Sequence, residues 1–114
     1  MKKDFEEVWI DIQRVLQNKD KITTICKGVS NQVIRITPEQ IVLKSELSKK
    51  GIYRKLCKKD FEYVWDKLSK GSIYGLNDVR DIIGRRAIIC AILALLDYVE
   101  GECINGRVHL RLKT

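Results

Sequence analysis

The feature that most constrains the fold is an apolar run over residues 87–96, in which no side chain is polar. Ten helical residues span roughly 15 Å, about half the thickness of a bilayer core. The run is therefore too short to cross a membrane, and it predicts a helix buried on every side of a soluble domain, over residues 84–98. Arg85 and Arg86 at its start oppose the helix dipole, which makes a ligand-facing role for them worth testing.

The size and composition indicate a single domain over residues 1–114. Of its residues, 45% are hydrophobic and 32% are charged, which is enough for a core and argues against disorder. The basic opening residues are not followed by an apolar signal segment. We therefore expect a cytoplasmic protein that does not associate with a membrane.

The cysteines are widely spaced, and no two of them form a metal-binding pair. They are Cys26, Cys57, Cys90 and Cys103, and His109 is the only histidine. A zinc site needs clustered thiolates or imidazoles, so we expect neither a metal nor any other cofactor. We predict four reduced cysteines that pack as small hydrophobic residues, with Cys90 inside the central helix.

The positive charge is concentrated in the second half of the chain. The formal net charge is +7, of which residues 1–48 contribute +1 and residues 49–114 contribute +6. A basic half on a small domain favours a polyanionic partner, usually nucleic acid. A lysine-rich surface that only keeps the protein soluble is an equal alternative on charge alone.

The first half of the chain predicts a helix followed by strands. Apolar residues at spacings of three and four give one apolar face to a helix over residues 4–18, within an N-terminal segment 1–20. We expect a three-stranded antiparallel meander within residues 22–46. Its strands are expected at residues 22–26, 33–36 and 41–44. Its core face is expected to hold Ile34, Ile36, Ile41 and Leu43.

The second half has the element order of a winged helix over residues 60–112. A helix at 60–70, a short strand at 72–74 and a short helix at 76–83 precede the central helix. Asn105-Gly106, the strongest short hairpin signal, joins strands at 100–104 and 107–112. Val108, Leu110 and Leu112 are expected on one face of the hairpin, and Arg107, His109 and Arg111 on the other. The predicted fold class is therefore α+β.

No catalytic constellation is evident in the sequence. His109 is flanked by arginines, with no adjacent serine or cysteine, and a glycine-rich phosphate loop is absent. A restriction-type metal nuclease needs an acidic residue two positions before a lysine, whereas Glu46 and Lys49 are three apart. We therefore expect a protein that is not an enzyme.

The densest cationic segment, residues 49–59, contains six basic residues and no acidic one. The predicted central helix is wholly apolar after Arg86, so it lacks the polar side chains that read base edges in the major groove. We therefore expect contacts with phosphates rather than recognition of bases.

Four segments form a pattern seen in a known class of proteins. They are residues 24–31 (Thr-Ile-Cys-Lys-Gly-Val-Ser-Asn), Lys44-Ser45-Glu46-Leu47-Ser48, the helix at 61–68, and Gly84-Arg85-Arg86 before an apolar helix. Over residues 22–100 the chain resembles a small module attached to restriction-type endonucleases, often of the HNH class, and to related helicase-bearing defence proteins. The resemblance implies DNA recognition without catalysis, and it points to Gly28, Asn31, Ser48, Arg85 and Arg86. The nuclease half of such proteins has no counterpart here.

Together these observations predict a non-catalytic module that binds DNA, with duplex DNA as the expected form, within a restriction or defence system. The expected contacts are Lys27, Asn31, Ser48, Lys49, Lys50, Arg54, Arg85, Arg86, Arg107 and Arg111. Structural alternatives remain open: Gly28 and Asn31 can serve a turn, and the two arginines can pair with Asp78 and Asp81. A second function is also open, a protein-interaction or homodimerisation module that uses Phe5 and Trp9 of the N-terminal helix.

Overall fold

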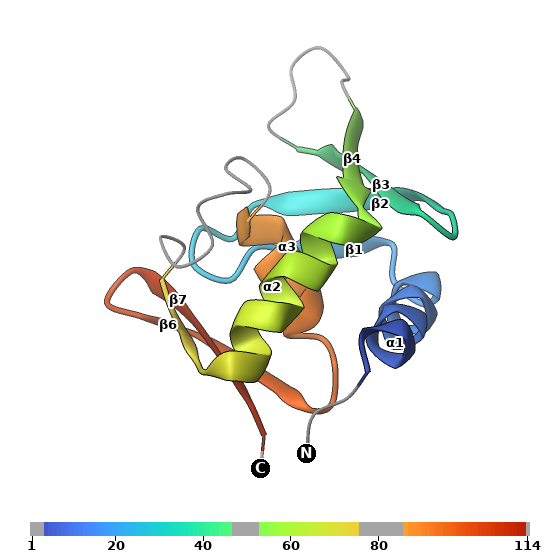
Figure 1. Cartoon of the computed structure of the whole chain (residues 1–114). Coiled ribbons are helices and arrows are strands. Elements are labelled where there is room, and N and C mark those ends of the chain that lie inside the picture. The colour runs from blue at the N-terminus through green and yellow to red at the C-terminus, as the bar shows by residue number, and fades with distance from the viewer. Residues whose placement is uncertain (1–3, 47–52, 76–85, 114) are drawn as a thin grey trace.

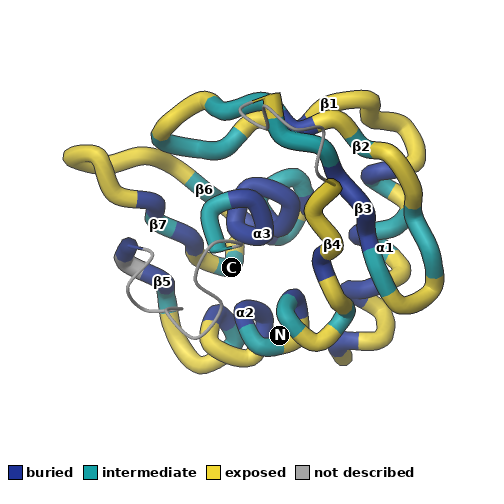
Figure 2. The backbone as a smooth tube through the Cα atoms, turned by 90° about the horizontal axis from the view of Figure 1, so that it is seen from above, coloured by how far each residue is buried: buried dark blue, intermediate teal, exposed yellow. Residues whose placement is uncertain are grey.

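A buried helix stands at the centre of the computed structural model, which describes residues 4–46, 53–75 and 86–113. This helix, α3 (Arg86–Leu93), has six consecutive buried residues, from Ile88 to Leu93. Figure 2 shows the other elements arranged around it. The predicted central helix is therefore confirmed, but it ends at Leu93 instead of residue 98. Hydrogen bonds from Leu95 to Ile92 and from Leu96 to Leu93 tighten the chain into turns at that point.

Four antiparallel strands form the larger sheet, in chain order. They are β1 (Lys21–Thr23), β2 (Ser30–Ile36), β3 (Gln40–Ser45) and β4 (Tyr53–Cys57). The prediction of a three-stranded meander is wrong by one strand, β4. This edge strand buries only Leu56 and carries Arg54 and Lys55, so its sequence resembles a solvated basic run.

The predicted core face of this sheet is wrong at one position, Ile34. Val33 pairs with Leu43 and Arg35 pairs with Val42, so Ile34 is an extra residue in a β-bulge. Its side chain is 40% exposed, whereas Ile41 and Leu43 are fully buried. The bulge shifts the alternation that the sequence pattern assumes.

Two amphipathic helices complete the core, as predicted. They are α1 (Phe5–Gln17) and α2 (Lys58–Lys70), and α2 begins two residues earlier than expected. The Trp9 ring lies 5.3 Å from the Phe61 ring, measured between centroids, so the two helices meet through their aromatic residues. The apolar face of α1 is thus occupied by its own chain (Figure 1).

The C-terminal hairpin is also confirmed. It consists of β6 (Val99–Ile104) and β7 (Arg107–Leu112), and β5 (Ile73–Tyr74) pairs with the other edge of β7. Asn105 and Gly106 both have positive φ, at 51° and 77°, as the tight hairpin turn requires. The helix predicted at residues 76–83 lies outside the described residues.

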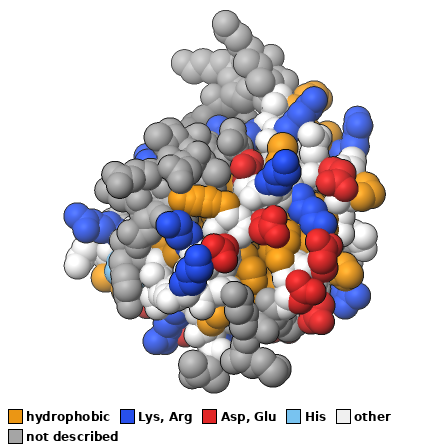
Figure 3. Space-filling model, in the orientation of Figure 1, with side chains coloured by type: hydrophobic (Ala, Val, Ile, Leu, Met, Phe, Trp, Pro, Cys, Tyr) orange, Lys and Arg blue, Asp and Glu red, His pale blue; other side chains and the backbone are white. Residues whose placement is uncertain are grey.

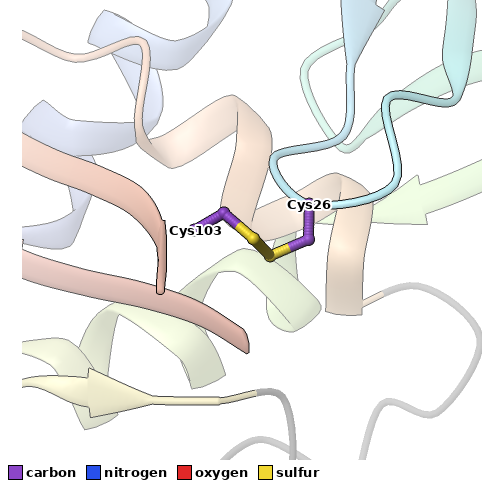
Figure 4. Close-up of a disulfide and its surroundings, with 2 residues drawn as sticks. All are labelled: Cys26 and Cys103. Atoms are coloured by element: carbon purple, nitrogen blue, oxygen red, sulfur yellow. A yellow bond between two sulfur atoms is a disulfide. The ribbon is translucent and has the colours of Figure 1, made fainter. Parts of the chain in front are cut away.

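A disulfide between Cys26 and Cys103 links the β1–β2 connection to β6 (Figure 4), and their Cα atoms are 5.2 Å apart. The prediction of four reduced cysteines is therefore wrong for this pair. Cys90 is buried as expected, whereas Cys57 is exposed instead of packed. None of the helices in the described ranges has the length and apolar character that a bilayer crossing needs.

Candidate nucleic-acid interface

The four-stranded sheet contains basic residues but no acidic ones. Its strands carry five cationic side chains and no Asp or Glu. These cations are Lys21, Arg35, Lys44, Arg54 and Lys55. None of the five forms a salt bridge with another described residue, so their charge is not neutralised within this part of the chain.

Strand register places four of these cations on one side of the sheet. Lys21 is opposite Gln32, which is opposite Lys44, and Lys44 is opposite Tyr53. In the next row, Arg35 and Lys55 flank Val42. We call these seven residues the outer sheet face. The alternate positions on the other side, such as Ile22, Leu43 and Leu56, are buried in the core.

The cations of the outer sheet face and Tyr53 are accessible, whereas Val42 between them is only 9% exposed. Lys21, Arg35 and Lys55 are exposed, Lys44 is half-buried, and Tyr53 is 54% exposed. Neighbouring strands are about 4.8 Å apart, and alternate residues on one strand are about 7 Å apart. Lys21 and Lys44 are therefore two strand spacings apart, about 10 Å, and so are Arg35 and Lys55. The mutual repulsion within each pair would be relieved by a bound polyanion.

Acidic side chains gather elsewhere, over α1. Asp4, Glu6, Glu7 and Asp11 belong to this helix or its cap, with Arg14 as its only basic residue. Figure 3 shows acidic side chains on the side of the molecule where α1 lies and also over the centre of this view, with basic side chains among them. The strands of the larger sheet, which have no acidic residue, therefore differ in charge from the acid-rich start of α1, and this difference would favour the approach of a polyanion from the sheet side.

Four of the predicted contact residues, Ser48, Lys49, Lys50 and Arg85, lie outside the described residues. Of the others, Lys27 is exposed in the β1–β2 loop, and Arg54 is exposed on β4. Arg86 is the half-buried first residue of α3, and Arg107 is exposed at the start of β7. The described members of the predicted set are therefore spread over several elements.

Asn31 and Gly28 have the geometry expected if they serve the turn between β1 and β2, which is the structural alternative to a contact with DNA. Asn31 is only 2% exposed, and its side-chain nitrogen donates a hydrogen bond to the Val29 carbonyl at 3.3 Å. Gly28 has a φ of 66°, the left-handed conformation that favours glycine. Both residues shape the β1–β2 connection in the structure.

The basic face of the hairpin is partly neutralised. Arg111 donates a hydrogen bond from its Nε to Glu100 at 2.7 Å, and Glu102 lies opposite His109. The alternation of Arg107, His109 and Arg111 with buried Val108 and Leu110 follows the prediction. Because two glutamates share this face, it is a weaker phosphate-binding surface than the outer sheet face.

The predicted contacts do not include Lys21, Arg35, Lys44 or Lys55, although Lys55 belongs to the cationic segment 49–59. Lys21, Arg35 and Lys44 each stand in a strand next to apolar residues, so they form no run of charge in the sequence. A count of acidic residues per strand is the signal that could have found them, because all four strands have none.

No group of three His, Cys, Asp or Glu side chains within the described ranges is arranged to hold a metal ion. Burial raises the pKa of the Cys90 thiol to about 12, so this cysteine is protonated at neutral pH.

No family model, no curated protein and no solved structure matches the chain.

Proposed function

We propose that this protein is a non-catalytic nucleic-acid-binding module, and that duplex DNA binds across the outer sheet face. The observation that carries the proposal is that four adjacent strands present four accessible cations and no acid. Cations on a polyanion release counterions on binding, which is the main source of affinity for such a surface.

The expected mode of binding is contact with phosphates. A recognition helix places polar side chains in the major groove, but α3 is buried on all sides and cannot enter a groove. Lysine and arginine on a sheet surface can contact successive phosphates without reading base edges. We therefore propose binding with low sequence specificity.

Two finer parts of the proposal rest on the sequence alone. One is the winged-helix-like organisation of residues 60–112, which needs a helix at 76–83. The other is the place of the module in a restriction or defence system, which rests on the resemblance described above. The expected lack of catalysis rests on the sequence, which shows no catalytic constellation, and on the same resemblance. The cytoplasmic location is proposed on the same footing.

The alternative, a partner or second copy docked on α1, has less support. Phe5 and Trp9, which would have made the contact, are 7% and 3% exposed and lie in the protein's own core. Ile10 is the exposed large apolar residue of this helix, at 52%. A single exposed residue does not make an interface.

The test is the salt dependence of binding to a fluorescent duplex of generic sequence. We expect the logarithm of the association constant to fall linearly with the logarithm of salt concentration, by about 0.9 per phosphate contacted. Single-stranded DNA and duplex RNA of equal length serve as comparisons. An affinity that does not change with salt concentration, or no binding at low salt, would contradict the proposal. Clearly tighter binding to single-stranded DNA or to duplex RNA would reject duplex DNA as the ligand.

A further inference from the structure

The disulfide joins two parts of the chain that belong to different sheets. Cys26 lies in the connection between β1 and β2, and Cys103 lies on β6, 77 residues later. Beside the bond, the Ile25 side chain rests against Gly101 of β6. Figure 4 shows the β1–β2 loop held against the hairpin at this point. The bond therefore fixes the position of the loop relative to the hairpin.

Each side of the bond carries an exposed cation. Lys27 directly follows Cys26, and Arg107 pairs across the hairpin with Ile104, the neighbour of Cys103. The loop also continues into β2, a strand of the outer sheet face. The bond thus influences the position of Lys27, near the sheet, relative to Arg107, on the hairpin.

The loop keeps its own shape through local hydrogen bonds. The Thr24 amide donates to the Val29 carbonyl at 3.0 Å, and the Val29 amide donates to the Thr24 hydroxyl at 2.9 Å. The Gly28 amide donates to the Thr24 carbonyl at 3.2 Å. These bonds can form without the disulfide, but they should open more often once the loop is no longer tied to the hairpin.

The hairpin is held to the core independently as well. Val99, Val108 and Leu110 are buried, and β5 pairs with β7. Opening the disulfide should therefore loosen the relation between loop and hairpin without unfolding either the core or the four-stranded sheet.

We propose that the Cys26–Cys103 bond is a reducible latch, which sets the position of the β1–β2 loop relative to the β6–β7 hairpin and thereby the affinity of the nucleic-acid interface. The effect on affinity rests on the proposed function, whereas the latch itself does not. Cys103 is exposed and Cys26 is half-buried, so a dithiol in solution can reach the bond.

The chemistry of opening is thiol–disulfide exchange. One thiolate of the dithiol attacks a cysteine sulfur, the sulfur–sulfur bond breaks, and the other cysteine leaves as a thiolate. The second thiol of the dithiol then resolves the mixed disulfide. Two electrons pass to the protein, the dithiol becomes a disulfide, and both cysteines end as thiols. Reducing compartments, such as the cytoplasm proposed above, favour the open form that binds more weakly, and oxidising compartments favour the closed form.

The test is hydrogen exchange of the full chain, oxidised and after treatment with dithiothreitol. Cys57→Ser serves as the background, because it removes the exposed free thiol and prevents disulfide reshuffling. We expect amides of the β1–β2 loop and of the hairpin to exchange about tenfold faster after reduction, while β2, β3 and α2 keep their protection. Adding Cys103→Ser should reproduce the fast exchange and abolish the response to dithiothreitol.

Unchanged exchange after reduction would overturn the latch. Loss of protection throughout the described elements would overturn it too, because the bond would then be a general staple. In the binding assay the reduced form should bind the duplex about threefold to tenfold more weakly, and equal affinities would overturn the coupling. If the oxidised protein does not bind the duplex, the proposed function is wrong. Hydrogen exchange would still show whether the disulfide holds the loop against the hairpin.

Discussion

The indole nitrogen of Trp9 donates a hydrogen bond to the carbonyl of Pro38 at 2.9 Å. Gln13, one helical turn later, donates to the neighbouring Thr37 carbonyl at 3.0 Å. These two bonds attach α1 to the β2–β3 turn, 29 and 24 residues further along the chain. The same Trp9 ring packs on Phe61, so this residue joins α1 to both the sheet and α2.

Replacing Trp9 with Phe should remove the hydrogen bond and leave part of the site unfilled. A lost hydrogen bond of this kind costs about 1 kcal/mol, and the smaller ring adds about 1 kcal/mol through the cavity that it leaves. Urea denaturation should therefore show a free energy of unfolding about 2 kcal/mol lower. Gln17→Ala, at an exposed position of the same helix, is the control and should change it little. Equal effects of the two substitutions would contradict the role assigned to Trp9.

Gly101 should not tolerate a side chain. A Cβ atom there would lie 2.7 Å from Cβ of Ala94 and 2.9 Å from Cδ2 of Leu110. Gly101→Ala is therefore expected to lower the free energy of unfolding by about 1–3 kcal/mol through overpacking. Gly71→Ala is the matched control, because no atom lies within 4 Å of that Cβ and the backbone is extended. A stability loss at Gly71 as large as that at Gly101 would refute the packing argument.

The two free cysteines should differ in reactivity. Cys57 is exposed, whereas Cys90 is fully buried and burial raises its thiol pKa to about 12. Because the thiolate is the reactive form, iodoacetamide near neutral pH should label Cys57 quickly and Cys90 only after unfolding. Mass spectrometry of the labelled peptides measures both rates, and Cys57→Ser should remove the fast phase. Similar rates at the two sites would rule out a buried Cys90.

The raised thiol pKa of Cys90 also predicts a loss of stability at alkaline pH. In the unfolded chain a thiol titrates at about 8.5, whereas the folded protein holds this proton until about pH 12. The resulting stabilisation is complete below the lower pKa and is lost as pH rises towards the higher one. Burial and the hydrogen bond to Asp11 raise the pKa of Tyr98 as well, with the same sign.

Tyr98→Phe is therefore the background in which to test Cys90. In that background, replacing Cys90 with Ala should make the decline in unfolding free energy between about pH 9 and about pH 11 shallower. Urea denaturation at each pH measures the slope. A slope that Cys90→Ala leaves unchanged would show that this thiol does not contribute to the alkaline loss.

The parts of the fold that sequence predicts correctly are those fixed by local patterns. The unbroken apolar run predicts α3, because a helix with no polar side requires burial all round. Asn105-Gly106 predicts the hairpin turn, because both residues accept a positive φ. Trp9 and Trp65 mark the buried faces of α1 and α2 through their spacing from other apolar residues.

The parts that sequence misses depend on partners far along the chain. Residues of β4 form a strand because they pair with β3. A register shift between β2 and β3 leaves Ile34 in a bulge, with its side chain facing outward. The disulfide joins cysteines that are 77 residues apart, so no spacing rule signals it. The outer sheet face is missed for the same reason, because register brings Lys21, Lys44 and Lys55 to one side.

The central claim is that the outer sheet face contacts phosphates, and two matched charge variants test it. Lys44→Gln with Lys55→Gln removes two charges from this face. Lys67→Gln with Lys70→Gln removes two charges from the C-terminal turn of α2, which runs away from the sheet (Figure 1). The total change in charge is the same, so the overall charge of the protein does not explain a difference between the two variants.

The measurement is the slope of duplex affinity against salt concentration, both on logarithmic scales, for the wild type and both variants. If the face contacts phosphates, the sheet variant should lower the magnitude of the slope by about 1.8, which corresponds to two contacts. The α2 variant should leave the slope nearly unchanged. Equal slopes for the two variants would contradict the claim and would leave the positive charge of the sheet as a surface that only keeps the protein soluble.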